Sequence, residues 1–552
     1  MKKSWWKEAV IYEIYPRSFM DSYGDGIGDI QGIIQKLDYL QNLGVDVLWL
    51  CPVYDSPNHD YGYDIRDYRK INEEAGSMDD FEALLDGVHM RGMKLIMDLV
   101  VNHTSDEHEW FKKSRQSKDN PYRDYYFWKP EKPNNWQSFF GGDAWEYDDK
   151  TGEWYLHLFT RKQPDLNWEN PDVRDDIYKM MRYLLDKGVD GFRMDVISLI
   201  SKRTDFKDTT HNAFTDVIEH VYANGPRVHE FLQEMNQRVM SQYDIMTVGE
   251  AVGVPNDQAL LYVGENRNEL NMIFHFEHMN MDAGPGGRFD PIDNDFIRFK
   301  KIFTEWDEAV SQKGWNSVFL DNHDYPRMVS RFGNDSEYRR ESAKLLAMMI
   351  LTMRGTPCIY QGSELGMTNV AYSQFEDYRD VEVRNTKEAW VKAGKDPDEL
   401  LSYVQKYSRD NARTPMQWNS DKHAGFTEGT PWINVNPNYK VINAESALED
   451  PDSVFWFYNR LISFRKRHPV LVYGDFEQTD NDHPQLFAYR RWNEEEEFRV
   501  YLNFSDEVCD IENLPRNGFE MVMANQLYSE PPQEDRLLPW EARIYSKDVL
   551  NP

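Results

Sequence analysis

One helix and the strand after it can be predicted from residues 170–196, NPDVRDDIYKMMRYLLDKGVDGFRMDV. Asn170 is a favoured N-cap and Pro171 a favoured first helical residue, and apolar side chains recur behind them at helical spacing. Residues 190–196 then form an apolar run of strand length. A helix that leads directly into a buried strand is typical of parallel α/β folds.

The same alternation continues on both sides of this stretch. Helical patterns end at Gly44, begin at a Ser77–Asp80 capping box, and recur at 296–313 and 337–353. Eight strands are expected, at residues 9–16, 46–51, 94–101, 190–196, 245–250, 270–277, 317–324 and 357–361. Eight such units predict an α/β protein with a (β/α)8 TIM barrel, and a doubly wound open sheet is the alternative.

Two segments depart from this rhythm. Residues 104–170 are rich in Trp, Asp, Asn and Gly and are too long for a plain loop, so we expect an inserted subdomain after the third strand. Short alternating runs at 486–492 and 498–504 indicate an antiparallel β domain. The expected division is a barrel of residues 1–103 and 171–473, an inserted subdomain at 104–170, and a C-terminal β-sandwich domain at 474–552.

Composition narrows the classes of partner. The chain has 63 Lys and Arg against 95 Asp and Glu, a net charge of −32, which disfavours nucleic acid and anionic membranes. Cys51, Cys358 and Cys509 are too scattered for a disulfide framework or a thiolate metal site, and they fit a reducing compartment. The longest apolar run, Leu345–Met353, is far shorter than the ~20 residues of a membrane span, and no signal peptide is visible. We therefore expect a cytoplasmic protein with a small neutral ligand.

Acidic residues recur where the predicted strands end, which is where a barrel gathers its catalytic groups. Arg193 and Asp195 lie two residues apart on one strand, so both project to the same side. Crowded carboxyls separate in pKa, so that one stays ionised while another holds a proton, as displacement at a glycosidic carbon requires. The flanking residues at these strand ends are Asp98, Asn102, His103, Glu250, His323 and Asp324.

Six short blocks carry a family resemblance. They are Asp98-Leu-Val-Val-Asn-His103, Gln163-Pro-Asp-Leu-Asn167, Gly191-Phe-Arg-Met-Asp-Val196, Glu250, Asn322-His-Asp324 and Arg409-Asp-Asn-Ala-Arg-Thr-Pro-Met-Gln-Trp418. On these blocks the chain closely resembles the α-amylase superfamily, glycoside hydrolase family 13, in the branch of oligo-1,6-glucosidases, dextran glucosidases and α-glucosidases. The resemblance covers essentially the whole chain and implies hydrolysis of a small oligosaccharide without an organic cofactor.

The resemblance also implies a role for each matching residue. Asp195 is the expected nucleophile, Glu250 the acid/base, and Asp324 the third carboxyl, which stabilises the transition state. A retaining double displacement would place the first two carboxyls ~5–5.5 Å apart. The expected sugar-binding residues are Asp60, Tyr63, His103, Arg193, His323 and Arg413, with Arg413 as the partner of Asp60 and Arg409 as the alternative partner.

Linkage preference depends on the residue after the nucleophile. In this branch a valine, here Val196, accompanies α-1,6 cleavage, whereas alanine or threonine accompanies α-1,4 preference. Glu382 matches a contact to the leaving sugar, and Arg288 stands where the branch often has lysine. The open alternatives are maltose, sucrose or trehalose 6-phosphate as substrate. A non-catalytic relative, such as a transporter heavy-chain ectodomain, is disfavoured because the acid triad is complete and no membrane span is present.

A calcium site is suggested by Asp21-Ser-Tyr-Gly-Asp25-Gly-Ile-Gly-Asp29, which sets acidic oxygens on a glycine-rich loop. An EF-hand is disfavoured because Gly32 occupies its twelfth position. The resemblance implies a structural Ca²⁺ held by Asp21, Asp25, Asp29 and the carbonyl of Ile27, with Tyr23 where the branch usually has asparagine. For assembly we expect a monomer or a small homo-oligomer.

Overall fold

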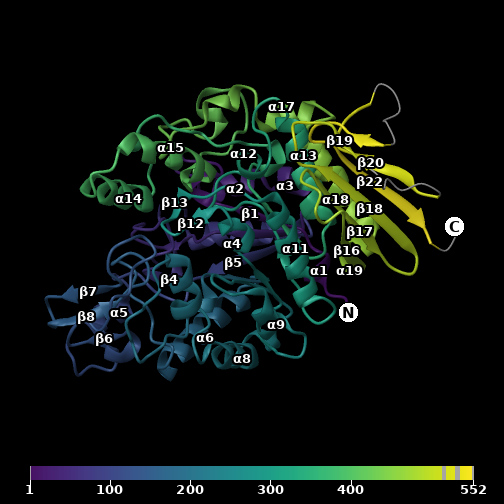
Figure 1. The fold of residues 1–552 in the computed structure, drawn as a ribbon. Helices are drawn as coiled ribbons and strands as arrows, with labels where there is room; N and C mark the ends of the chain where they lie inside the picture. The colour runs from purple at the N-terminus through teal and green to yellow at the C-terminus, as the bar shows by residue number, and fades with distance from the viewer. Residues whose placement is uncertain (1, 512–517, 529–534, 550–552) are drawn as a thin grey trace.

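Eight parallel strands lie at the centre of the structure, a computed structural model that describes residues 2–511, 518–528 and 535–549. They follow their chain order around the sheet, and the two end strands contact each other, so the sheet curls into a nearly closed barrel (Figure 1). The strands are β1 (Ile11–Ile14), β2 (Val47–Leu50), β5 (Lys94–Leu99), β9 (Gly191–Met194), β10 (Met246–Glu250), β11 (Met272–Phe274), β14 (Ser317–Val318) and β15 (Thr356–Tyr360). The predicted TIM barrel is confirmed, and the doubly wound sheet is excluded because the strand order never reverses.

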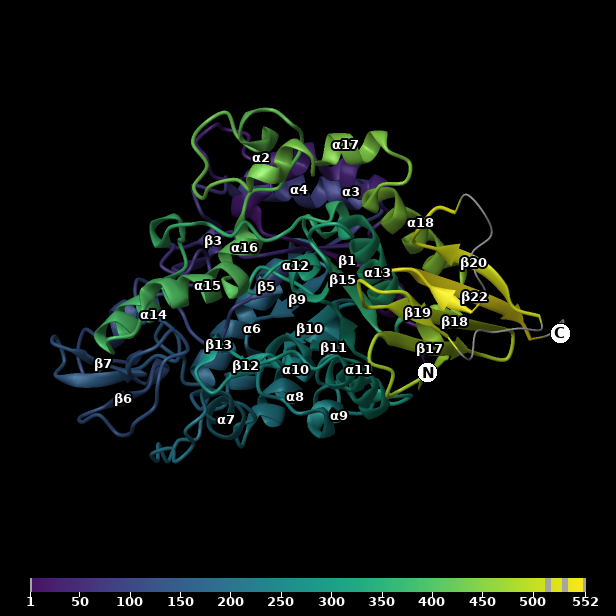
Figure 2. The same ribbon diagram turned by 45° about the horizontal axis from the view of Figure 1, so that its top comes forward.

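Helices cover the outside of this barrel (Figure 2). Each buries an apolar face against the strands, and the barrel and its helices share one continuous apolar core. The main barrel helices are α2 (Ile30–Gln35), α3 (Leu37–Leu43), α4 (Met78–Met90), α6 (Pro171–Asp186), α8 (Val228–Arg238), α9 (Ala259–Val263), α11 (Phe296–Val310), α13 (Arg339–Thr352) and α18 (Val454–Arg467). Further helices above the barrel are α14 (Val381–Lys392), α15 (Pro397–Tyr407), α16 (Asp410–Arg413) and α17 (Ala444–Glu449).

The capping signals in the sequence predict helix starts correctly. Ser77 and Asp80 form a reciprocal capping box at α4, and the Asn170 side chain caps α6 with Pro171 as the first helical residue. The apolar stripe at 30–40 predicts the buried face but not the continuity of the helix. The chain leaves helical geometry at Lys36, and α2 and α3 bury the same face on either side of that break.

Most strands are shorter than predicted, and the runs 270–277 and 317–324 lose the most residues. The run 317–324 forms a strand only at β14, because the carbonyl of Phe319 accepts a hydrogen bond from the His278 side chain rather than from a neighbouring strand. The run 270–277 likewise forms a strand only at β11. The residues that follow β14 form a loop, and this loop contains His323 and Asp324.

Residues 104–170 contain a short helix and a three-stranded antiparallel sheet of order β6-β8-β7. Figure 1 shows this segment on the opposite side of the barrel from the C-terminal strands. Several hydrogen bonds join it to the barrel, among them those of Leu166 N–H to the Asn102 carbonyl and of Trp168 Nε1 to the Val101 carbonyl, beside the bridge between His103 and Asp165. The elements are α5 (Glu109–Ser114), β6 (Trp128–Lys129), β7 (Trp145–Asp148) and β8 (Glu153–Leu156).

The C-terminal part contains two antiparallel sheets. A five-stranded sheet of order β16-β17-β18-β22-β20 faces the two-stranded sheet β19-β21 across a small apolar cluster that includes Leu486, Tyr501 and Leu537. Residues 512–517, 529–534 and 550–552 of the expected C-terminal domain lie outside the described residues, and the domain division remains a proposal. The strands are β16 (Asp475–Thr479), β17 (Leu486–Trp492), β18 (Glu496–Asn503), β19 (Cys509–Asp510), β20 (Glu520–Ala524), β21 (Arg536–Leu537) and β22 (Ala542–Asp548).

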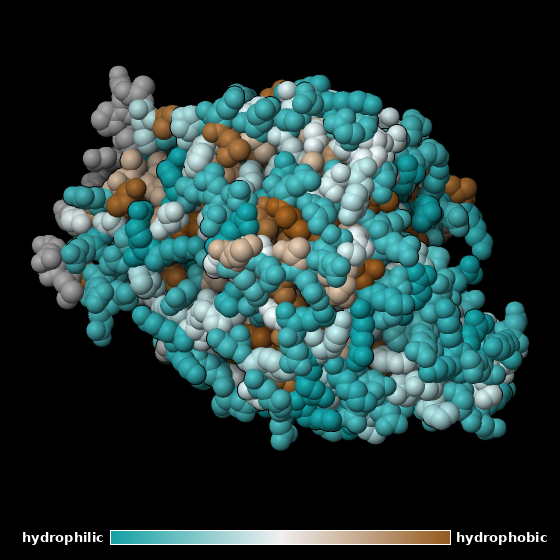
Figure 3. All heavy atoms as spheres, turned by 180° about the vertical axis from the view of Figure 1, so that it is seen from behind, coloured by the Kyte–Doolittle hydropathy of each residue, from teal (hydrophilic) through white to brown (hydrophobic). Residues whose placement is uncertain are grey.

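Hydrophilic residues predominate on the face of the molecule seen in Figure 3, and hydrophobic residues lie there in small separate patches. All three cysteines are buried and free. Within the described ranges, no helix combines the length and the apolar character needed to cross a bilayer.

Candidate active site

One arginine joins the two carboxyls expected to carry the chemistry. Arg193 of β9 is 1% exposed, and its Nη1 donates to Asp195 Oδ1 at 2.8 Å while its Nη2 lies 2.8 Å from Glu250 Oε2. Asp195 follows β9 and Glu250 ends β10, the next strand in the barrel. The adjacent strands therefore bring the expected nucleophile and acid/base onto one guanidinium.

A third carboxyl anchors that guanidinium from the neighbouring strand. Asp98 of β5 accepts from Arg193 Nη1 at 2.6 Å, and its other oxygen accepts from Trp49 Nε1 and the Tyr63 hydroxyl. Burial raises the pKa of Asp195 well above its ordinary value; Arg193 opposes this shift, and Glu250 and Asp98 add to it. Asp195 therefore retains a proton more readily than an exposed aspartate does.

The backbone at Val196 is strained in a way that serves this pair. Val196 lies in the left-handed region at φ 35°, which is rare for a β-branched residue. In this conformation its N–H donates to Glu250 Oε2 at 2.9 Å. The residue next to the expected nucleophile therefore helps to hold the expected acid/base.

Asp324 lies on the loop after β14 among three cationic groups. Its Oδ1 accepts from Arg413 at 2.9 Å and Arg409 at 3.1 Å, and its Oδ2 lies 3.1 Å from His323 Nε2. Burial alone raises the pKa of Asp324, but His323 and the two arginines outweigh it and hold the pKa well below its usual range. Asp324 is therefore ionised, as a carboxylate that binds sugar hydroxyls needs to be.

Asp60 marks the closed end of the pocket, but its partner differs from the expected one. Arg409 Nη2 lies 3.8 Å from Asp60 Oδ1, whereas Arg413 pairs with Asp324. The expectation of an Asp60–Arg413 pair is wrong, and the alternative with Arg409 is correct. The physical reason is that Arg413 Nε donates to the backbone carbonyl of His323, which points its guanidinium toward Asp324.

Gln163, from segment 104–170, lies beside Asp60. Its amide nitrogen donates to Asp60 Oδ2 at 3.0 Å and to the Tyr63 carbonyl at 3.3 Å. Burial raises the pKa of Asp60 to about 6, while Arg409, Arg413 and this amide lower it. Segment 104–170 thus contributes directly to the environment of Asp60.

His103 is held as a neutral donor. The amide nitrogen of Asn102 lies 3.1 Å from its Nδ1, so Nδ1 accepts and Nε2 carries the hydrogen that is donated to the Tyr63 carbonyl at 3.1 Å. Burial lowers the pKa of His103 to about 4, which keeps the ring uncharged at neutral pH. In this structure the Nε2 hydrogen is used by the Tyr63 carbonyl, and the role of His103 as a donor to a sugar hydroxyl stays a prediction.

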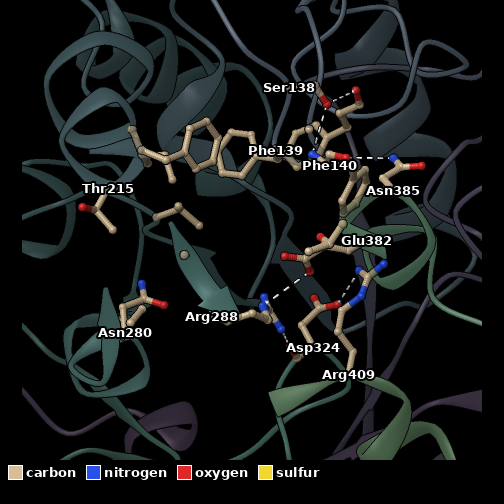
Figure 4. Close-up of a pocket in the computed structure, with 18 of the residues that line it drawn as sticks. Ser138, Phe139, Phe140, Thr215, Asn280, Arg288, Asp324, Glu382, Asn385 and Arg409 are labelled. Carbon is tan, nitrogen blue, oxygen red and sulfur yellow. Dashed lines mark hydrogen bonds and ion pairs between the residues drawn. The ribbon is translucent and has the colours of Figure 1, made fainter. Parts of the chain in front are cut away.

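A cavity of about 850 Å³, large enough for a small oligosaccharide, is lined by Asp60, Tyr63, His103, Asp195, Glu250, Asp324 and Arg409. Phe139 and Phe140 of segment 104–170 also line it (Figure 4), and the Arg409 guanidinium lies over the Phe140 ring, 5.1 Å from its centroid. Phe139 stacks on Phe159 with ring centroids 4.8 Å apart, and Asn385 of α14 donates to the Phe140 carbonyl at 2.8 Å. The cavity therefore has an aromatic wall and a charged wall, which meet where Phe140 packs on Arg409.

Glu382 and Arg288 lie between these two walls (Figure 4). Arg288 Nε lies 3.4 Å from Glu382 Oε2, and its Nη1 donates to the Asp324 carbonyl at 2.7 Å. Both residues line the cavity, and Tyr325 lies beside them with its ring under the Arg288 guanidinium. Glu382 and Arg288, which sequence reasoning placed near the leaving sugar, thus lie beside each other in the lining of the cavity.

The acidic loop 21–29 satisfies most of its own oxygens. Asp21 accepts from three backbone N–H groups of the loop and from the Thr427 hydroxyl. Asp29 caps α2, whereas Asp25 accepts only from one loop N–H and keeps free acceptor capacity. Tyr23 is 57% exposed. The donor set, three carboxylates and a carbonyl, is the type that a hard cation such as Ca²⁺ prefers.

Sequence reasoning did not assign several residues that shape the site. Asp98 and Gln163 lie inside recognised blocks, so their position signalled importance without indicating which groups they contact. The phenylalanines of segment 104–170 and Tyr325 carried no pattern that distinguishes a pocket wall from core. Glu13 of β1, which lies behind His323, gave no signal because it occupies the middle of an apolar strand.

Comparison with known proteins is consistent with this geometry. A family model described as the alpha-amylase catalytic domain matches residues 13–474. The chain is 56% identical to an oligo-1,6-glucosidase of Parageobacillus thermoglucosidasius, over 99% of both chains, and 52% identical to one of Bacillus cereus, over 99% of this chain and all of the relative. Among solved structures, a variant of isomaltulose synthase from Erwinia rhapontici NX5 in complex with sucrose superposes with a TM-score of 0.96 at 47% identity, covering 99% of each chain.

The family model spans most of the chain, and both relatives align along almost its whole length. The fold, the carboxyl-lined pocket and these matches agree. The chain belongs to the alpha-amylase family of glycoside hydrolases.

Proposed function

We propose that the protein is a retaining exo-α-glucosidase that releases glucose from the non-reducing end of isomaltose and short isomalto-oligosaccharides. The observation that carries the proposal is the pairing of Asp195 and Glu250 on Arg193 within a cavity of about 850 Å³. The similarity to oligo-1,6-glucosidases over the whole chain supports the choice of linkage.

The reaction proceeds in two displacements. In the first, the Asp195 carboxylate attacks the anomeric carbon while Glu250 gives its proton to the leaving oxygen. In the second, Glu250 takes a proton from water, and the resulting hydroxide displaces Asp195 from the same carbon. The glucose is released with its original anomeric configuration.

Exo action follows from the charges at the closed end of the pocket. Asp60 and Arg409 form a buried ion pair there, and Asp324 is held beside them by Arg409 and Arg413. These groups bind the hydroxyls of one terminal glucose, and a longer chain would have to displace them. Tyr63, His103 and His323 contact the same sugar, and Glu382 with Arg288 contacts the leaving one.

The test is the ratio of kcat/KM for isomaltose to that for maltose, measured by glucose release. We expect this ratio to be well above one for the wild type. In Val196→Ala we expect it to fall by about tenfold or more, because losing a contact the size of one methylene group changes selectivity by ~1–3 kcal/mol. A wild-type ratio below one would overturn the α-1,6 assignment. Turnover of sucrose or trehalose 6-phosphate at higher kcat/KM would replace the proposed substrate by that sugar.

We also propose that loop 21–29 binds a structural Ca²⁺ through Asp21, Asp25, Asp29 and the Ile27 carbonyl, with the backbone of Tyr23 in place of a side-chain ligand. The free acceptor capacity of Asp25 supports this assignment. Calcium should raise the Tm of the wild type and have no effect on Asp25→Ala. An equal response of both proteins would contradict the site.

A cytoplasmic location and a monomeric or small homo-oligomeric state complete the proposal. Three buried free thiols support the cytoplasmic location. Light scattering coupled to size exclusion measures the oligomeric state, and a large assembly would contradict the proposal.

A further inference from the structure

Glu13 is a buried carboxyl that the proposed reaction does not use. It lies in the middle of β1, is fully buried, and places Oε1 2.6 Å from Nδ1 of His323. The same oxygen lies 3.3 Å from the backbone N–H of His323 and accepts from it. A carboxyl removed from water needs such partners, so this contact fixes both groups.

The other nitrogen of His323 also faces a carboxyl. Nε2 lies 3.1 Å from Asp324 Oδ2, and it has no well-aligned hydrogen-bond acceptor among the described residues. The ring is stacked between Tyr15 and Tyr63, with centroids 5.8 and 5.3 Å away, so it cannot turn. A hydrogen on each nitrogen would let the ring donate to Glu13 through Nδ1 and face the Asp324 carboxylate with Nε2–H.

We propose that Glu13 is a positioning residue that keeps His323 doubly protonated, so that its Nε2–H is always available to Asp324 and to a hydroxyl of the bound glucose. The inference rests on the proposed function for the identity of that sugar. Glu13 does not touch the substrate and acts only through His323.

The neighbouring histidine shows what happens without such a carboxyl. His103 also contacts the pocket, but its Nδ1 accepts from the amide of Asn102, and burial lowers its pKa to about 4. Burial acts on His323 in the same direction, yet Asp324 and Cys51 raise its pKa well above the ordinary value. Glu13 Oε1, 2.6 Å from Nδ1, adds a hydrogen-bond acceptor that His103 lacks. One pocket therefore holds one neutral and one cationic histidine.

Cys51 is the other side chain that contacts Glu13 and His323. Its Sγ lies 3.6 Å from Glu13 Oε1, and burial raises the pKa of the thiol to about 12, so it remains a weak donor to the carboxylate. The 2.6 Å contact between Glu13 and His323 is a hydrogen-bond distance, so the group holds a proton rather than a metal ion. The titratable and charged groups that face His323 or Glu13 come from several elements of the barrel. They include Tyr15 after β1, Cys51 after β2, Tyr63 before β4, Arg193 of β9, Asp321 after β14, Asp324 on the same loop, Cys358 and Tyr360 of β15, and Arg413 of α16.

The test is Glu13→Gln, which keeps the shape of the side chain and removes its charge. Glu364→Gln is the matched control, because Glu364 is equally buried and accepts from Tyr12 and Tyr39, away from His323. The inhibition constant for glucose is measured from pH 6 to 8.5, together with the ¹³C-labelled histidine spectrum, in which His323→Gln identifies the signal.

We expect glucose binding in the wild type and in Glu364→Gln to change little between pH 7 and 8.5, above the pH at which Asp60 titrates. In Glu13→Gln it should weaken by about tenfold or more between pH 6 and 8.5, as His323 loses its proton within that range. The His323 signal should be that of an imidazolium throughout in the wild type and should titrate in the variant. Flat binding in Glu13→Gln with an unchanged imidazolium signal would overturn the proposal.

The wild-type spectrum tests the proposal without any variant. A His323 that is neutral at pH 7 would mean that the proton lies on Glu13, and the proposal would be wrong even if Glu13→Gln failed to fold. A protein that neither binds glucose nor hydrolyses isomaltose would overturn the proposed function instead, while the His323 titration would still decide the protonation state.

Discussion

Arg193 is the residue that sets the charge balance of the site. Its guanidinium contacts three carboxyls, on Asp98, Asp195 and Glu250, while only 1% exposed. Burial raises the pKa of Asp195, and Arg193 is the group that lowers it most strongly. The nucleophile attacks only when ionised, so the acid limb of the kcat/KM profile reports this pKa.

Replacing Arg193 by glutamine removes the positive charge that lowers the pKa of Asp195. The pKa of Asp195 therefore rises, and the acid limb of the kcat/KM profile moves to higher pH. We expect kcat/KM at neutral pH to fall at least about 100-fold. Arg193→Lys keeps the charge and should shift the limb less, although a lysine cannot contact three carboxyls in this geometry. An acid limb that stays in place in Arg193→Gln would show that another group controls Asp195.

At the same scale, Val196 shows where sequence reasoning ends. The sequence places a valine after the nucleophile and links it to linkage preference. It does not reveal that the backbone there is left-handed at φ 35° or that the N–H of Val196 binds Glu250. Such a conformation depends on tertiary contacts that override local preference, and a β-branched residue is the type least expected to adopt it.

At the scale of elements, one buried cation joins α13 to the C-terminal sheet. Arg491 of β17 is fully buried, and it donates to carbonyls at the end of α13, such as that of Thr352, and to carbonyls of residues 470–474. Thr352 ends α13, where carbonyls lack intrahelical partners. The guanidinium therefore caps α13 and joins it to residues 470–474, which lead into the C-terminal sheet.

Arg491→Ala should lower the free energy of unfolding by about 3–5 kcal/mol, because several buried carbonyls lose their donor at once. The matched control is Arg490→Ala, one residue earlier on the same strand, whose partner Glu477 is about half exposed. That variant should cost less than about 1 kcal/mol. Chemical denaturation measures both, and equal losses would contradict the capping role.

The order of the elements was predictable, whereas their exact ends were not. Capping residues at Ser77 and Asn170 gave correct helix starts because the cap is a local interaction. The run at 317–324 became a strand of two residues because a distant side chain, His278, takes a carbonyl of that run. Sequence reasoning preferred Arg413 to Arg409 as the partner of Asp60 for the same reason. The orientation of the Arg413 side chain depends on the backbone carbonyl of His323, 90 residues away in sequence.

At the scale of the whole molecule, buried neutral histidines make the fold sensitive to acid. Burial lowers the pKa of His103 and His108 to about 4, that of His275 to about 3, and that of His278 further. Unfolded histidines titrate near ~6.5, so below that pH the unfolded chain binds more protons and stability falls. His323 acts in the opposite direction, because its raised pKa stabilises the folded protein at low pH. This contribution is lost as the pH rises through the pKa that His323 has in the folded protein.

His275→Phe should reduce the loss of stability between pH 6.5 and 4.5, since it removes one group that must charge on unfolding. The His275 ring stacks on Trp306 with centroids 4.4 Å apart, so a phenylalanine can keep the packing. Thermal unfolding at several pH values measures the slope, with the exposed His211→Gln as control. An unchanged slope in His275→Phe would show that other groups dominate acid unfolding.

The central claim is that Asp195 forms a covalent bond to glucose, and trapping of that intermediate tests it most directly. The enzyme is incubated with 5-fluoro-α-D-glucosyl fluoride, and intact and peptide mass spectrometry locate the adduct. We predict the addition of one fluoroglucosyl group on the peptide that contains Asp195, and none in Asp195→Asn. An adduct on another residue, or rapid turnover with initial release of the β-anomer, would contradict the account.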